Sequence, residues 1–155
     1  MTAYLVRHAK AGRRDEWDGP DRLRPISDAG HRQADGLVAV LAGRGIGRVL
    51  SSPYVRCVET VQPLADRLGL IVESHDALAE GADVDDAIAL VAEAARANGV
   101  LCSHGDMIPA VLDELARADG LALAHDFPFA KGSAWVLDGP GRPFVSARYV
   151  EPPPS

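Results

Sequence analysis

The stretch Tyr4-Leu5-Val6-Arg7-His8-Ala9-Lys10-Ala11-Gly12 decides the organisation of this chain. Its first three residues are apolar and predict a short buried strand, which ends abruptly in a charged loop that contains glycine. Arg7 and His8 therefore stand where the strand ends, and ligands bind at the carboxyl ends of strands in an open α/β sheet. Imidazole is a nucleophile at neutral pH and guanidinium holds two phosphoryl oxygens at once, so the pair suits an anionic substrate. A solvated strand edge would carry the same pair, and residues further along the chain must decide between the two interpretations.

The composition is that of one globular domain. The chain has 155 residues, of which 47% are hydrophobic and 25% charged. This length is enough to bury a proper core, and the sequence contains neither repeats nor a composition shift that would indicate a second domain. We predict one domain over residues 1–150, followed by a disordered proline-rich tail at residues 151–155.

The charge and the cysteines narrow the functional class. A formal net charge of −6 argues against a protein that coats nucleic acid or an anionic membrane, so any basic site must be local. Cys57 and Cys102 are too few for a disulfide framework and are expected to be buried thiols. The sequence lacks an apolar run of about 18 residues and shows no signal-peptide pattern at Met1, so we expect a cytoplasmic protein.

Hydrophobic periodicity predicts strands and helices in alternation. We expect strands at residues 4–6, 46–50, 70–73, 100–103, 133–137 and 144–149, and helices at 28–42, 53–68, 84–97 and 107–118. Ser27 is the expected N-cap of the first helix, and Pro53 fits the first position of the second. The order indicates an α/β protein, a three-layer αβα sandwich whose mixed sheet is mostly parallel, with an antiparallel strand near the C-terminus.

Three of the predicted strands end in residues that suit a phosphate site. Parallel strands bring their carboxyl ends to one edge of the sheet, where arginines, histidines and helix N-termini would converge. Each set alone fits an ordinary surface position, but the conjunction favours a functional site. The three sets are Arg7 and His8, then Ser51 and Ser52 with Arg56 in the following helix, and finally His104 and Gly105.

A long polar loop at residues 9–26 adds further positive charge near the first of these sets. It contains Lys10, Arg13, Arg14, Arg22 and Arg24, and Lys131 precedes a late strand. Long ordered loops in compact domains are often functional. Lys10, Arg13, Arg14 and Lys131 could hold an extra phosphate of a nucleotide or a phosphoprotein surface; charged decoration of a loop is the alternative.

The motifs together resemble the histidine phosphatase (phosphoglycerate-mutase-like) superfamily over essentially the whole domain. The short length of this chain is similar to that of the SixA-type phosphohistidine phosphatases. Tyr4 to Arg13, and Lys131-Gly132-Ser133 with Trp135, are also similar to the phosphatase module that some Nudix hydrolases carry at their C-terminus. The matching motifs are Arg7-His8-Ala9, Pro25-Ile26-Ser27-Asp28-Ala29-Gly30 with Gln33-Ala34, Ser51-Ser52-Pro53 with Arg56 and Glu59-Thr60, and Ser103-His104-Gly105.

The resemblance implies a role for each core residue. His8 would be the nucleophile and become phosphohistidine, while Arg7, Arg56 and His104 would bind the phosphoryl group and stabilise its transition state. The backbone amide of Gly105 would add a donor. The resemblance implies hydrolysis without a metal or cofactor, since side chains already supply the positive charge.

The general acid is less sharply defined. Glu80, in Leu78-Ala79-Glu80-Gly81, aligns with the acid that protonates the leaving oxygen in many members, and Asp76 and Asp83 are rival candidates. The chain departs from the family's common pattern at Ala9, Lys10 and Arg14, which leaves phosphoryl chemistry intact and the substrate open.

Four functions are compatible with these residues. The leading hypothesis is a metal-independent phosphatase that acts on a phosphohistidine protein or a small phosphorylated compound. A nucleoside polyphosphate phosphatase is a second, and a phosphoglycerate-type mutase a third, although mutases of this family are longer and build a lid from insertions. A phosphate-binding module without turnover is the fourth, and the presence of all four core residues argues against it.

Overall fold

Strands and helices follow one another in the predicted order in the computed structural model, which describes all 155 residues. The strands are β1 (Thr2–Arg7), β2 (Val49–Ser51), β3 (Val72–Ser74), β4 (Val100–Ser103), β5 (Ala134–Asp138) and β6 (Ser146–Val150). The α-helices are α1 (Asp28–Leu41), α2 (Val55–Leu68), α3 (Val84–Ala95) and α4 (Met107–Asp119). Three single-turn 3-10 helices are η1 (Arg14–Glu16), η2 (Asp21–Leu23) and η3 (Asp76–Leu78).

The six strands form one mixed sheet in the order β3-β2-β4-β1-β5-β6. Strands β1, β2, β3 and β4 are parallel, β5 is antiparallel to β1, and β6 is antiparallel to β5, which confirms the predicted architecture. Since β1 lies between β4 and β5, the residues that follow it emerge at the middle of the carboxyl edge. The β1–β4 register pairs Arg7 with Ser103, and the β2–β4 register pairs Ser51 with Cys102, so all three predicted strand ends meet there.

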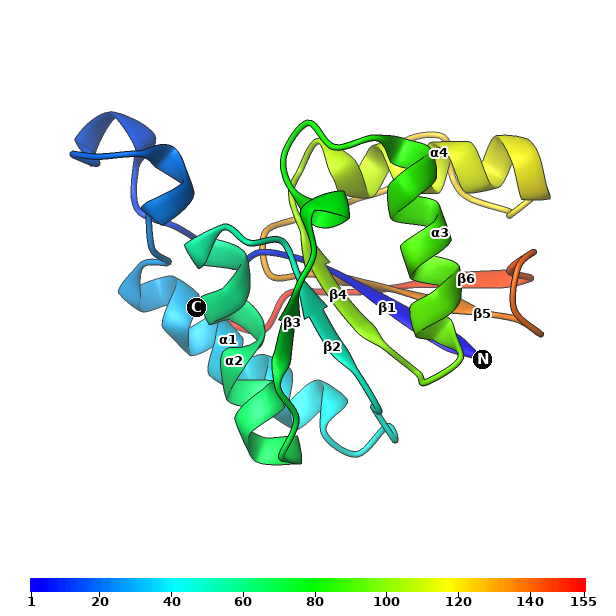
Figure 1. The fold of residues 1–155 in the computed structure, drawn as a ribbon, viewed down its shortest axis with the longest axis horizontal. Helices are drawn as coiled ribbons and strands as arrows, with labels where there is room; N and C mark the ends of the chain where they lie inside the picture. Colours follow the sequence, from blue (N-terminus) through cyan, green and yellow to red (C-terminus); the bar gives the residue numbers. More distant parts are fainter.

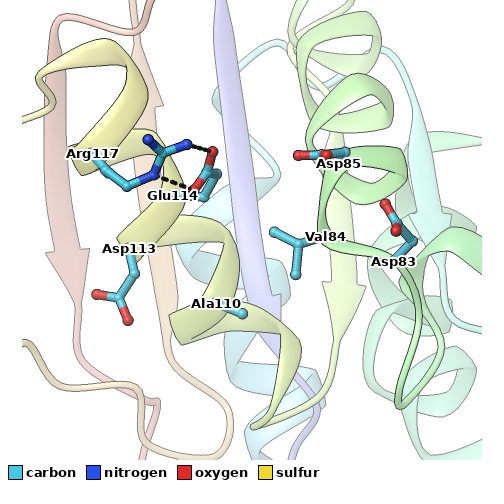
Figure 2. Close-up of a pocket in the computed structure, with 7 residues that line it drawn as sticks. All are labelled: Asp83, Val84, Asp85, Ala110, Asp113, Glu114 and Arg117. Atoms are coloured by element: carbon cyan, nitrogen blue, oxygen red, sulfur yellow. Dashed lines mark hydrogen bonds and ion pairs between the residues drawn. The ribbon is translucent and has the colours of Figure 1, made fainter.

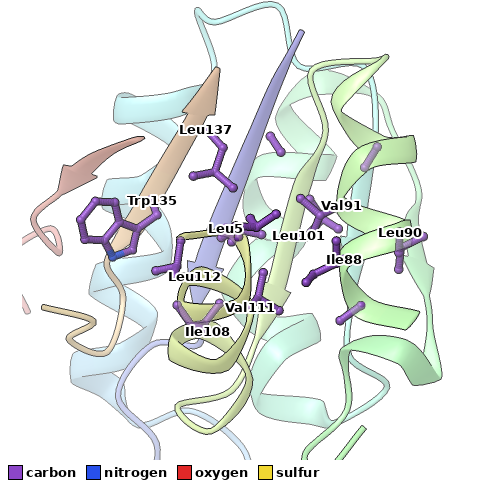
Figure 3. Close-up of a cluster of buried hydrophobic side chains, with 14 of the residues drawn as sticks. Leu5, Ile88, Leu90, Val91, Leu101, Ile108, Val111, Leu112, Trp135 and Leu137 are labelled. Carbon is purple, nitrogen blue, oxygen red and sulfur yellow. The ribbon is translucent and has the colours of Figure 1, made fainter. Parts of the chain in front are cut away.

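The helices cover both faces of the sheet, as Figure 1 shows. Alternate residues of β1 point to opposite faces, as expected of a strand. Tyr4 and Val6 belong to the buried cluster under α1 and α2. Leu5 belongs with Leu101 to the cluster under α3 and α4 (Figure 3). This double burial explains why β1 reads as a continuous apolar run.

The second helix begins later than its sequence indicates. Pro53 lies before the helix, Tyr54 is its N-cap with an extended backbone, and α2 begins at Val55. The physical reason is a local turn: the Tyr54 N–H donates to Ser52 Oγ at 3.2 Å, which holds the chain out of helical conformation directly after β2. Strands β2 and β3 are also shorter than predicted at their beginnings.

The first helix is fixed to the loop after β1. Ser27 is the N-cap, as predicted, and its Oγ accepts the Gly30 N–H at 3.1 Å. The Ser27 N–H also donates to the Lys10 carbonyl at 2.9 Å. Gly30 allows this close approach, because a Cβ there would clash with the Lys10 carbonyl oxygen and press on Ile26. The start of α1 therefore supports the loop that follows His8.

The proline-rich end at residues 151–155 lies against α1. Pro153 is buried against α1 beside Gly36, and Lys10 Nζ donates to Ser155 Oγ at 2.8 Å. Gly36 has no side chain, so it leaves room for the apolar proline ring, and composition alone does not show such a docking place. No helix in the structure combines the length and the hydropathy that a membrane crossing requires.

Replacing Gly30 with alanine tests the packing of α1 against the loop. Alanine normally stabilises a helix interior by about 1 kcal/mol relative to glycine. Here we expect Gly30→Ala to lower the free energy of unfolding by roughly 1–3 kcal/mol in urea, because the new Cβ meets backbone that cannot move aside. Gly36→Ala is the matched control in the same helix: its Cβ meets only Pro153, so it should displace the tail and spare the domain. An unchanged stability of Gly30→Ala would refute this packing.

Candidate active site

A polar hollow of about 250 Å³ opens at the carboxyl edge of the parallel strands. No hydrophobic residue lines it, and positively charged side chains outnumber the carboxylates. Such a lining is unsuited to an apolar ligand and suits an anion with several oxygens. The lining residues are Arg7, His8, Arg14, Arg24, Arg56, Glu80, Gly105, Asp106 and Lys131.

Arg7 is held at the end of β1 by backbone and side-chain contacts. Its Nη1 donates to the Phe129 carbonyl at 2.8 Å, and its guanidinium lies 5.5 Å from the Phe129 ring centroid. Burial lowers the pKa of Arg7 from its ordinary value, although an arginine stays charged in a protein. Gly105 permits this position, because a Cβ at Gly105 would lie 2.5 Å from Arg7 Nη2. The guanidinium therefore rests directly on the turn that follows β4.

His8 is buried and oriented by its own loop. Its Nδ1 lies 2.8 Å from the Ala9 carbonyl oxygen, which can only accept, so Nδ1 carries the proton. The unprotonated Nε2 makes no hydrogen bond within the protein. Burial lowers the pKa of His8 to about 3, and the nearby charges of Arg56 and Arg7 act in the same direction, although the hydrogen bond with the Ala9 carbonyl opposes the shift. His8 is therefore neutral at pH 7, with a free lone pair on Nε2.

His104 faces His8 across the site. The two ring centroids are 5.5 Å apart, and the ring planes are inclined by 65°. His104 Nε2 lies 2.8 Å from Ser52 Oγ, whereas Nδ1 is buried without a partner. The ring also meets Tyr54 edge-on at a centroid distance of 4.6 Å. β2 and the start of α2 thus fix the ring that the end of β4 supplies.

Arg56 is the most buried charge of the site, with 1% of its surface exposed. Its Nη1 donates to the Asp21 carbonyl at 2.9 Å, and its Nη2 donates to Asp21 Oδ2 at 3.0 Å and to Glu80 Oε1 at 3.3 Å. The guanidinium also lies 4.9 Å from the Tyr54 ring centroid. Although burial opposes it, Arg24 and Arg56 lower the pKa of Asp21. Two carboxylates thus compensate a charge that could not otherwise be buried.

Three further cations surround this core. Arg24 is buried and donates from Nε to Asp21 Oδ1 at 3.0 Å. Arg14 pairs with Asp21 and, at 3.5 Å, with Glu80. Burial lowers the pKa of Lys131, and the charges of Arg7, Arg24, Arg56 and Arg14 lower it further. The lining of the hollow contains five cations and two carboxylates, so it holds more positive charge than its carboxylates balance.

Side chains outside the hollow hold the backbone after His8. Thr60 Oγ1 accepts the Ala9 N–H at 2.9 Å, and Gln33 Oε1 accepts the Lys10 N–H at 2.9 Å. Gln33 also donates to the Lys131 carbonyl at 3.1 Å, which ties the two ends of the site together. Glu59 Oε1 accepts the Ile26 N–H at 3.0 Å. The motifs Gln33-Ala34 and Glu59-Thr60 therefore support the site indirectly, because their side chains hydrogen-bond to the backbone of the loops that carry it.

Most predicted site residues are brought together, and some are not. The hollow contains Arg7, His8, Arg56, Glu80, Gly105, Arg14 and Lys131, with His104 directly behind it. Lys10 points to Ser155, and Arg13 pairs with Asp15 and Glu16, so neither lines the hollow. A charged loop of this length turns its successive side chains in different directions, which sequence spacing does not reveal.

The sequence analysis did not select Asp21 or Asp106, and it named Arg24 only as one of the basic residues of the loop. Asp21 bonds both Arg56 and Arg24 from the long loop. Asp106 lines the hollow, and its Oδ2 accepts the Gly81 N–H at 2.8 Å. The sequence offered a weak signal for Asp106, which closely follows His104. Nothing local distinguished Asp21 from the other charged residues of residues 9–26.

A larger hollow of about 460 Å³ lies between the beginning of α3 and the middle and last turns of α4 (Figure 2). Its lining includes Asp83, Asp85, Asp113 and Glu114, with Arg117 paired to Glu114. This negative lining would repel a phosphorylated substrate. Asp83 is also the N-cap of α3, where its side chain accepts the Asp86 N–H. Of the three candidate acids, only Glu80 lies in the polar hollow.

The lowered pKa of His8 predicts a pH-dependent stability. Between the ordinary imidazole value of 6.5 and the folded value of about 3, the unfolded chain binds the extra proton, so stability falls as pH decreases. The contribution of one such group is about 1.4 kcal/mol per pH unit. We expect the difference in unfolding free energy between His8→Gln and wild type to shift by this slope, in favour of the variant, from pH 6 to pH 4. His31→Gln, at an exposed position on α1, is the control, and parallel curves for His8→Gln and wild type would contradict the prediction.

The chain matches the histidine phosphatase superfamily (branch 1) over residues 3–82. It is 35% identical over 160 residues to the 8-oxo-(d)GTP phosphatase of Mycolicibacterium smegmatis. That alignment covers 98% of this chain and 48% of the relative, so the chain spans about half the length of this curated protein.

Solved structures of SixA-type proteins share the whole fold. The protein assigned as phosphohistidine phosphatase SixA from Nakamurella multipartitia is 29% identical, with a TM-score of 0.79, and the match covers 97% of this chain and 95% of that one. The corresponding SixA protein of Agrobacterium tumefaciens is 26% identical, with a TM-score of 0.73 and 97% of each chain covered. Together with the match over residues 3–82, this likeness shows that the chain belongs to the histidine phosphatase superfamily of enzymes.

Proposed function

We propose that this domain is a phosphatase that transfers a phosphoryl group to His8 and then to water, without a metal. One observation carries the proposal. Three buried side-chain atoms lack a hydrogen-bond partner in the whole chain, and they are Arg7 Nε, Arg56 Nε and His104 Nδ1. Unsatisfied buried polar atoms are costly, and the two arginine Nε–H groups can only donate, so this cluster beside a neutral histidine suits an acceptor with several oxygens. A phosphoryl group supplies oxygens to all three.

The proposed first step is in-line attack on phosphorus by His8 Nε2. A P–N bond to His8 forms as the bond from phosphorus to the leaving group breaks, which is a P–O bond in a phosphate ester and a P–N bond in a phosphohistidine protein. The arginines neutralise the charge on the phosphoryl oxygens. Glu80 in its protonated form gives its proton to the leaving oxygen or nitrogen. Glu80 Oε1 lies 3.3 Å from Arg56 Nη2, so the acid stands beside the arginine that is proposed to hold the transferred group.

The second step returns the site to its starting state. Glu80, now a carboxylate, accepts a proton from a water molecule that attacks the phosphohistidine. The P–N bond breaks, orthophosphate leaves, and His8 recovers its lone pair on Nε2. The Ala9 carbonyl holds the Nδ1 proton throughout, which keeps the ring in one tautomer during both steps.

A labelled substrate tests this mechanism. Rapid quenching should yield a phosphoprotein that is labile in acid and stable in base, and His8→Ala should abolish it while lowering kcat at least about a thousandfold. Excess chelator should leave the wild-type rate unchanged. Label on a serine or an aspartate would refute the assignment of His8, and full loss of activity on chelation would refute the metal-free scheme. Binding of phosphate without turnover would indicate a binding module instead.

Two substrate classes are candidates. The SixA-type relatives favour a phosphohistidine protein, or a small phosphorylated compound, as the first. A nucleoside polyphosphate is the second, because a relative is an 8-oxo-(d)GTP phosphatase and the hollow holds positive charge beyond one phosphoryl group. After Arg7 and Arg56 are assigned to the transferred group, Arg14, Arg24 and Lys131 remain. Arg24 is buried in its ion pair with Asp21, which leaves Arg14 and Lys131. We propose that these two bind a second anionic group of the substrate.

Charge reversal at two adjacent arginines tests the second anionic position. Arg14→Glu should lower kcat/KM for a nucleoside diphosphate about tenfold more than for an aryl monophosphate, and added salt should reduce that difference. Arg13→Glu is the matched control, because Arg13 carries the same charge but pairs with Asp15 and Glu16 away from the hollow. Equal effects of the two variants on both substrates would show that the loop charges do not select the substrate.

A further inference from the structure

Ser52 contacts His104 at Nε2, whereas the other ring nitrogen, Nδ1, has no hydrogen-bond partner. The hydroxyl is fully buried and has two contacts: its Oγ accepts the Tyr54 N–H at 3.2 Å, and it lies 2.8 Å from His104 Nε2. The neighbouring Ser51 is equally buried, but its hydroxyl donates to the Ser52 carbonyl at 2.8 Å and does not touch the histidine. Only one of the two serines at the end of β2 is therefore connected to the site.

Counting hydrogens decides the direction of the Ser52–His104 bond. A serine hydroxyl has one hydrogen to donate. Its oxygen already accepts from Tyr54, and His104 Nε2 is the one acceptor within reach of the hydrogen. If Nε2 carried the proton instead, the Ser52 hydrogen would be buried without an acceptor, at a cost of roughly 1–3 kcal/mol. The satisfied arrangement has Ser52 donating to an unprotonated Nε2.

From this geometry we propose that Ser52 is a positioning residue that fixes His104 as the neutral tautomer with its proton on Nδ1. Nδ1 is the atom that lacks a partner in the free protein, and in this tautomer it is an N–H donor. His104 then offers a hydrogen bond to a phosphoryl oxygen while remaining uncharged. The arginines supply the positive charge, and the two histidines face each other without repulsion.

The groups that face His104 make the opposite tautomer a real competitor. His8 faces the ring from the end of β1, Tyr54 from the start of α2, and Cys57 Sγ lies 3.6 Å from Nε2. Arg7 lies against the adjacent Gly105, and Arg56 lies over the Tyr54 ring. Burial alone would raise the pKa of the Cys57 thiol, but hydrogen bonds with Cys102 and His104 lower it to about 6. A Cys57 thiolate would attract a proton to Nε2. Against this, the Cys57 thiol has its own acceptor in the Ser103 carbonyl, and Ser52 is the closer partner of the ring.

Nitrogen NMR of the wild-type protein tests the tautomer directly. In ¹⁵N-labelled protein at pH 7.5, the His104 ring should show a protonated Nδ1 and an unprotonated Nε2, with the signals assigned by their loss in His104→Gln. This measurement needs neither turnover nor substrate. A protonated Nε2 with an unprotonated Nδ1, as a Cys57 thiolate would produce, would overturn the proposal, and so would a ring that carries both protons.

Enzyme kinetics test what the tautomer does, and this part rests on the proposed phosphatase activity. With an aryl phosphate, Ser52→Ala should lower kcat/KM about tenfold at pH 8, because the ring is then free to turn a lone pair toward the phosphoryl group. The deficit should shrink between pH 8 and pH 5.5, because any second proton that the ring gains puts a hydrogen on Nδ1. His8 stays neutral over this range, so the change reports on His104.

Two variants separate positioning from structure. Ser51→Ala removes an adjacent buried hydroxyl, and its ratio to wild type should be independent of pH. Ser52→Thr keeps the hydroxyl and should restore the wild-type pH profile. A pH-independent loss in Ser52→Ala would refute a role in setting the tautomer, even if activity falls. If wild type and His8→Ala prove equally inactive, the proposed function fails, and the NMR result still decides the tautomer.

Discussion

Burial of the Arg56 guanidinium at the carboxyl edge of the sheet is the constraint on which the rest of the site depends. A buried cation must be paired, and here the pairing comes from two distant segments, η2 with Asp21 and the turn with Glu80. Asp21 also binds Arg24, so one carboxylate connects two parts of the long loop to Arg56 at the edge of the sheet. The loop is therefore ordered by the same charge that is proposed to bind the phosphoryl group. The conformation of the loop and the charge of the binding site therefore both depend on the buried Arg56 guanidinium.

The arrangement leaves each functional group half-satisfied. Arg56 uses its two Nη atoms on carboxylate and carbonyl oxygens and leaves Nε without a partner. Arg7 uses Nη1 on the Phe129 carbonyl and also leaves Nε free. The hydrogen bonds of the Nη atoms thus orient each guanidinium, and the Nε–H donor is already positioned before a ligand binds. Such preorganisation lowers the stability of the free protein, and the lost stability is regained when an anion binds.

Several parts of this site could be predicted from residue order alone. Arg7, His8, Arg56 and His104 follow strand ends or begin helices, and a parallel sheet brings those positions to one edge whatever the details of packing. Glu80 depended on a short motif, and the hollow distinguishes it from Asp76 and Asp83. Asp21 and Arg24 could not be selected, because they lie in an irregular loop without periodicity. The directions of Lys10 and Arg13 were beyond sequence reasoning for the same reason.

The sequence by itself determined the alternation of strands and helices, the mixed sheet and the convergence of the core residues. Burial of apolar faces is a local property of residue spacing, so it can be recognised without coordinates. Only the tertiary structure decided which charges pair and which hydrogen bonds orient the imidazoles. Those depend on atoms that are distant in sequence: Ser52 beside His104, Asp21 beside Arg56 and Thr60 beside Ala9. Hydrogen bonds and ion pairs act over a few ångströms, and the relative placement of these segments is set by packing of the whole domain.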